Sequence, residues 1–91
     1  MGVLAINVFT AEITNDTLTL TQSMGVKKVS IFNGSSTAGT VTGTRTLGGT
    51  TSSAINVAEN ETFTVESSEA SVIASLVIVA PLGCTLKVVA Q

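Results

Sequence analysis

A two-residue alternation of hydroxyl and apolar side chains is the feature that most limits the folds open to this chain. Residues 17–21 read Thr-Leu-Thr-Leu-Thr without a break, and similar alternation returns around Val41 and over residues 62–65. Successive side chains of a β-strand point to opposite faces, so this pattern predicts strands with one buried face. Threonine suits such strands because its branched Cβ fits a pleated surface and its hydroxyl tolerates water. The 15 Thr and 10 Ser make these two residue types over a quarter of the 91 residues.

Turn-forming residues separate the alternating runs. They are Asn15-Asp16, Asn33-Gly34, Gly48-Gly49, Glu59-Asn60-Glu61 and Pro81-Leu82-Gly83. Asn-Gly favours the positive φ angles of a tight hairpin turn, so residues 33–34 are predicted to join two neighbouring strands. The predicted strands lie near residues 3–9 (an extension to 14 is left open), 17–22, 26–32, 38–46, 53–58, 62–67, 72–80 and 84–90.

This arrangement predicts an all-β fold, a small antiparallel β-sandwich or jelly-roll-like barrel of seven to eight strands. Residues 1–91 are predicted to form a single domain, since the chain is short and no linker divides it. The one helix candidate is residues 67–71, for which one turn is the most that we expect.

The segment 72–80 departs from the alternation because it is apolar on both faces, and residues 3–9 are so more weakly. A strand that is apolar on both faces must be covered on both, and 91 residues leave little chain for a second cover. Soluble monomers rarely expose large apolar patches, so we expect a homo-oligomer or another protein partner to supply that cover. Leu76 and Ile78 are expected in the core or at a subunit seam. The candidate contact residues are Val3, Ile6, Phe9, Val77 and Val79.

The composition argues against most other classes of function. The chain has no His, which removes Ser-His-Asp and Cys-His catalysis and imidazole metal ligands. Four Lys and Arg make no footprint for nucleic acid, and without Tyr or Trp a stacking platform would need the three Phe. We therefore expect no enzyme, no metal and no cofactor. The single cysteine, Cys84, is expected to be a small buried hydrophobe.

The longest apolar stretch, residues 72–82, is too short to cross a bilayer and contains Pro81. No positively charged region precedes the apolar residues at the start of the chain, so a secretory signal is not expected. The sequence therefore predicts a soluble protein made in the cytoplasm, with no membrane partner.

Three segments carry a resemblance to a known type of protein: residues 31–35, residues 55–65 and residues 78–83. With them, the chain resembles the small, His-free, Thr/Ser/Gly-rich all-β structural proteins of tailed-bacteriophage virions. The resemblance implies a head decoration (cement) protein, which sits on the capsid lattice as an oligomer, often a trimer, and stabilises it. It implies a virion location, the major capsid protein or another virion protein as partner, and no catalytic residues.

Alternatives from other classes stay open. A tail or fibre-attachment component would have the same composition. A carbohydrate- or surface-binding β-sandwich module is disfavoured by the lack of Tyr and Trp. A small enzyme is the least expected, because the chain has no His and few charges.

Overall fold

The computed structural model describes residues 9–44, 50–67 and 72–91, and this part of the chain is built almost entirely of antiparallel strands. The prediction of an all-β fold is confirmed. The elements are β1 (Phe9–Thr21), the short 3-10 turn η1 (Gln22–Met24), β2 (Lys28–Asn33), β3 (Gly39–Thr44), β4 (Ile55–Val57), β5 (Thr62–Glu66) and β6 (Ser75–Ala90).

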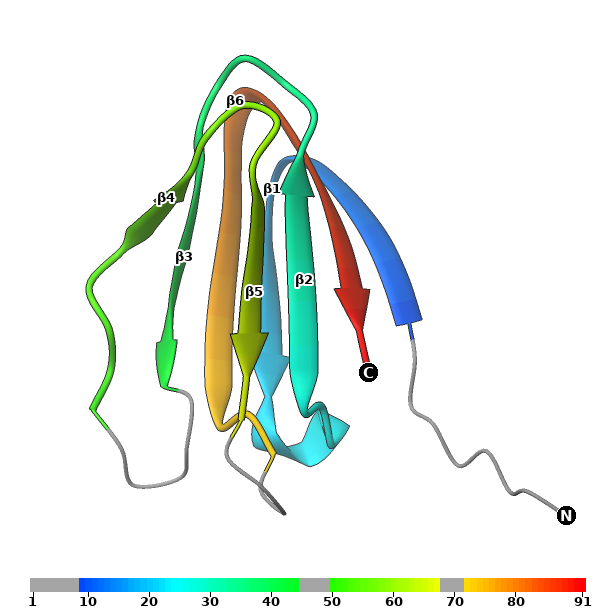
Figure 1. The fold of residues 1–91 in the computed structure, drawn as a ribbon, viewed down its shortest axis with the longest axis vertical. Helices are drawn as coiled ribbons and strands as arrows, with labels where there is room; N and C mark the ends of the chain where they lie inside the picture. Colours follow the sequence, from blue (N-terminus) through cyan, green and yellow to red (C-terminus); the bar gives the residue numbers. More distant parts are fainter. Residues whose placement is uncertain (1–8, 45–49, 68–71) are drawn as a thin grey trace, which may run out of the picture.

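Two long strands, β1 and β6, pair with each other along most of their length and bend together, so that one curled sheet forms two layers (Figure 1). In the first layer, residues 75–80 of β6 lie between residues 16–21 of β1 and strand β3, and β3 also pairs with β4. In the second layer, residues 85–90 of β6 lie between residues 9–14 of β1 and strand β2, and β2 also pairs with β5. Both layers therefore depend on the same two strands.

The bend lies where the sequence predicted turns. Asn15 has a φ of 50° and Gly83 a φ of 85°, and the register shifts between Thr14, opposite Thr85, and Asp16, opposite Ala80. The predicted turn residues thus bend two continuous strands rather than end them. For this reason two pairs of predicted strands merge, and the described residues contain six strands.

The core lies between the layers and takes alternate residues of each strand, as the period-two pattern predicts. Leu76 and Ile78 are buried, at 3% and 0% exposure, which confirms their expected place in the core. Cys84 is also fully buried, as expected. The other core residues are Ile13, Leu20, Val26, Val29, Ile31, Val41, Val57, Ile73, Ala80, Leu86, Val88 and Ala90.

The predicted Asn33–Gly34 hairpin is wrong. Strand β2 pairs with β5 and β6, whereas β3 pairs with β4 and β6, so the intervening loop crosses from one layer to the other. The Asn33 side chain is fully buried. Its Nδ2 donates hydrogen bonds to the backbone oxygens of Thr37 and Val57, both at 2.8 Å. Asn33 therefore does not begin a two-residue hairpin turn, and its buried side-chain amide holds the loop that crosses between the layers.

The polar turn predicted at residues 59–61 is confirmed. The Glu61 amide donates to the oxygen of Ala58 at 3.0 Å, Asn60 has a φ of 62°, and the Ala58 amide donates to Glu61 Oε1 at 2.8 Å. The Gly48-Gly49 turn and all but Ser67 of the helix candidate lie outside the described residues. Within the described part of the chain, no helix has the length and apolar character that crossing a membrane would need.

Candidate interaction surfaces

The structure brings two of the five predicted contact residues together. Val77 and Val79 are half-buried on the outer face of the first layer, two residues apart on β6. Val3 and Ile6 lie outside the described residues. Phe9 begins β1, but its side chain is not among those that the structure describes.

The two valines stand in the middle of a regular surface, which we call the threonine–valine face. The strand register places a threonine of β1 and a threonine of β3 on either side of each valine. None of the nine residues of this face carries a charge. Its three rows are Thr17–Val79–Thr40, Thr19–Val77–Thr42 and Thr21–Ser75–Thr44.

These threonine neighbours explain how the first layer tolerates a strand that is apolar on both faces. Side chains directly opposite each other on neighbouring strands have Cβ atoms about 4.5–5.5 Å apart, close enough for a threonine methyl to contact the valine. Val77 and Val79 are therefore half-buried without a third layer of described residues above them. A further cover from another chain stays a prediction.

The two-residue spacing of Thr40, Thr42 and Thr44 indicates that they share one face of a strand, but it does not indicate that Thr17, Thr19 and Thr21 join them. Spacing within one strand reveals which side chains are aligned. It does not reveal which distant strands lie beside β6, because that depends on pairings far apart in the chain. The period-two pattern of residues 17–21 was the one available signal.

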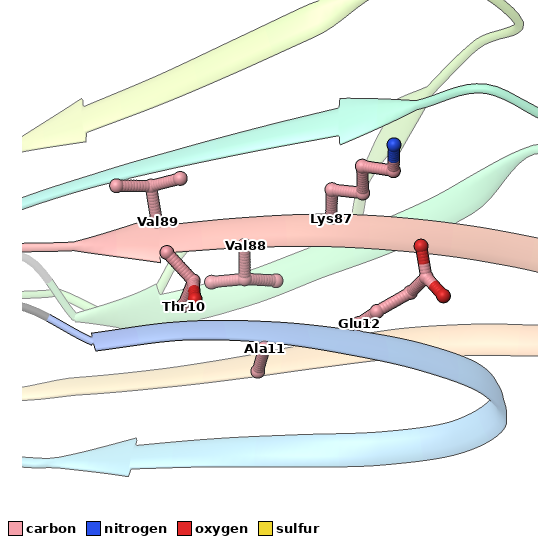
Figure 2. A pocket seen from close by; sticks show the side chains of 6 residues that line it. All are labelled: Thr10, Ala11, Glu12, Lys87, Val88 and Val89. Atoms are coloured by element: carbon pink, nitrogen blue, oxygen red, sulfur yellow. The ribbon is translucent and has the colours of Figure 1, made fainter.

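The outer face of the second layer is different in character. Here Glu12 and Lys87 are partners on neighbouring strands, and Phe32 and Val89 are each 37% exposed. A shallow hollow of about 280 Å³ lies over β1 and β6, with Glu12, Lys87 and Val89 around it (Figure 2). Its lining residues are Thr10, Ala11, Glu12, Lys87, Val88 and Val89.

An apolar notch of about 110 Å³ opens between the layers on the side of β3, β4 and β5. It has no ionisable side chain, and Ile55 at its rim is 39% exposed. Such a notch can accept an apolar group but has no group to transfer a proton. Its lining residues are Val41, Gly43, Ser52, Ile55, Phe63, Val65 and Leu76.

The described residues contain no group of three or more acidic, Cys or His side chains that could hold a metal ion. The regular surfaces of the described residues are the outer faces of the two layers and the strand edges. The comparisons add no relative: no family model, no curated protein and no solved structure matches the chain.

Proposed function

We propose that this chain is a non-enzymatic structural protein of a phage particle, a capsid decoration (cement) protein that binds and stabilises the head lattice as an oligomer. Its action is to bind protein surfaces, and it needs no cofactor, metal or nucleic acid. The same mode of binding would serve a tail or fibre-attachment component, so the experiment below must distinguish the head from other virion parts.

The observation that carries the proposal is the uncharged threonine–valine face. Burying a charged side chain costs free energy unless it is paired, and this face has none to bury. Its valines supply apolar area, and its hydroxyls can donate or accept hydrogen bonds with a partner's backbone. The protein can thus dock this uncharged face on another sheet without removing water from a charged side chain.

The resemblance to decoration proteins supports the choice of partner, and the composition supports the mode of binding. Only 11% of the residues are charged. Binding that buries apolar and hydroxyl groups should weaken little with added salt, because ionic screening acts on charges. A carbohydrate-binding module would need aromatic side chains for its sugar rings, and the chain has three Phe but no Tyr or Trp.

The test looks for a major capsid gene beside the gene of this chain and then measures co-sedimentation with empty capsids assembled from that capsid protein. The wild-type protein should sediment with the capsids at low and at high salt. Thr19→Lys places a charge on the threonine–valine face and should weaken binding by about tenfold or more. Thr64→Lys is the matched control: Thr64 is also an exposed threonine on an edge strand, but it belongs to the second layer.

Three results would overturn the proposal. One is a wild-type protein that does not bind capsids. The second is an equal loss of binding in both variants, because the threonine–valine face would then have no special part. The third is binding to isolated tails, or to glycans on an array, instead of capsids.

A further inference from the structure

Strand β1 is a free edge of both layers, because among the described residues it pairs only with β6. In an antiparallel pair, alternate residues of each strand direct their backbone N–H and C=O groups to the partner, and the residues between them direct theirs away. The outward groups of β1 can be assigned from hydrogen bonds elsewhere in the sheet.

In the first layer these outward groups are partly satisfied. The amide and carbonyl of Gly43 form hydrogen bonds with Ser52, so they point away from β6. Leu76, the partner of Gly43 on β6, therefore directs its own backbone groups to Leu20 of β1. The outward amides are then those of Thr17, Thr19 and Thr21. Thr17 donates to Asp16 Oδ1 at 2.7 Å and Thr21 to Met24 Sδ at 3.3 Å, so this half of the edge is capped at both ends.

In the second layer the outward groups are open. Lys28 and Gln91 exchange two backbone hydrogen bonds of 2.9 Å, so the backbone groups of Gln91 point toward β2. Because successive residues alternate in direction, the backbone groups of Leu86, Val88 and Ala90 point toward β1. The outward groups of β1 are then those of Thr10, Glu12 and Thr14. No described residue donates to or accepts from these three backbone positions. We call them the open edge.

We infer that the open edge is a strand-addition site, and that it is filled by the open edge of a second copy of this chain, antiparallel across a two-fold axis. The two edges present the same groups at the same spacing, as a two-fold interface requires. An unpaired strand edge is a template for another strand, and this one has neither Lys nor Pro to discourage pairing. The inference does not rest on capsid binding, since the threonine–valine face lies on the other layer.

The charges around the open edge fit a second copy. With Ala11 on the two-fold axis, each Glu12 lies opposite Thr10 of the second copy rather than opposite the other Glu12. Lys87 neighbours Glu12 on β6 of each copy and offsets its charge.

The test compares two proline variants by sedimentation equilibrium over a range of protein concentrations. Glu12→Pro removes an outward amide of the open edge and leaves the bonds to β6 in place. Thr19→Pro is the matched control, since it removes an outward amide from the capped half of the same strand. The wild type and Thr19→Pro should form dimers at micromolar concentration, and Glu12→Pro should dimerise about tenfold or more weakly. Circular dichroism checks that both variants are folded.

Amide exchange on the wild-type protein tests the same inference without a variant. The amides of Thr10 and Glu12 should become protected as the protein concentration rises, whereas the amide of Thr19 should not. A monomer at every concentration, a trimer, equal losses in the two proline variants, or protection that appears only with an added peptide would each overturn the inference. Capsid binding by monomeric Glu12→Pro would separate this result from the proposed function.

Discussion

The side-chain amide of Asn33 donates to the backbone oxygen of Val57 at 2.8 Å and so joins β2, in the second layer, to β4, in the first. The same amide group bonds the oxygen of Thr37, and its Oδ1 accepts from the Ser35 amide at 2.9 Å. One buried side chain therefore holds the crossing loop and both layers at this end of the molecule.

Asn33→Ala should lower the free energy of unfolding by about 1–3 kcal/mol, because it removes the buried hydrogen bond to the Val57 oxygen and the hydrogen bonds to Ser35 and Thr37. Urea unfolding followed by circular dichroism measures this. Asn56→Ala is the control, since Asn56 is exposed on the neighbouring position of β4. Equal effects of the two substitutions would show that the buried amide has no such role.

Gly43 permits the close approach of β3 to β6. A Cβ at this position would lie 2.3 Å from the backbone oxygen of Ser75 and 2.7 Å from Leu76 Cδ2. Gly43→Ala should therefore cost about 1–3 kcal/mol through forced separation of the strands. Gly34→Ala meets only the ring of Phe32 at 3.2 Å, and its melting temperature should stay near that of the wild type. A Gly43→Ala protein as stable as Gly34→Ala would contradict this account.

Leu76→Ala and Ile78→Ala should each cost about 2–5 kcal/mol, because both remove buried atoms and leave a cavity. Val79 also lies on β6 but on its half-buried outer face, so Val79→Ala should cost about 1 kcal/mol. Denaturant midpoints of the three variants give the ranking. If Val79→Ala were the most destabilising of the three, the face of β6 that carries Val79, and not the face that carries Leu76 and Ile78, would be the buried one.

The Cys84 thiol should not react with a thiol reagent in the native protein, since the side chain is fully buried. Colour development with such a reagent should be slow in buffer and complete within the mixing time in guanidinium. Full reaction at the mixing time in buffer would show that the bend of β6 opens readily.

The sequence predicted the features that depend on neighbours in the chain. The apolar character of residues 72–80 was enough to expect Leu76 and Ile78 in the core or at a subunit seam, and the composition of 59–61 was enough for the turn. The course of the chain at Asn15, Asn33 and Gly83 was not predictable in this way. A turn residue shows that an unusual φ angle is tolerated, but whether the strand ends there or only bends depends on its distant partner.

The same limit applies to the surfaces. The valines of β6 were predicted to be contact residues from their apolar neighbours alone, and their contact role stays a prediction. That threonines of β1 and β3 flank them follows from the pairing of Thr17 and Thr40 with Val79. Both threonines lie far before Val79 in the sequence. The difference between the capped and open halves of β1 depends on individual hydrogen bonds, for which the sequence has no periodic signal.

The central position of β6 has a consequence for how the protein is made. It is the last of the six strands in chain order, yet it pairs with β1, β2 and β3. The hydroxyls of Thr14 and Thr85, which hydrogen-bond at the bend, are separated by 71 positions. Before β6 leaves the ribosome, only the pairs β2–β5 and β3–β4 can form, and β1 has no described partner strand. Neither layer can be completed until β6 emerges, so a chaperone that shields the earlier strands during synthesis would raise the yield.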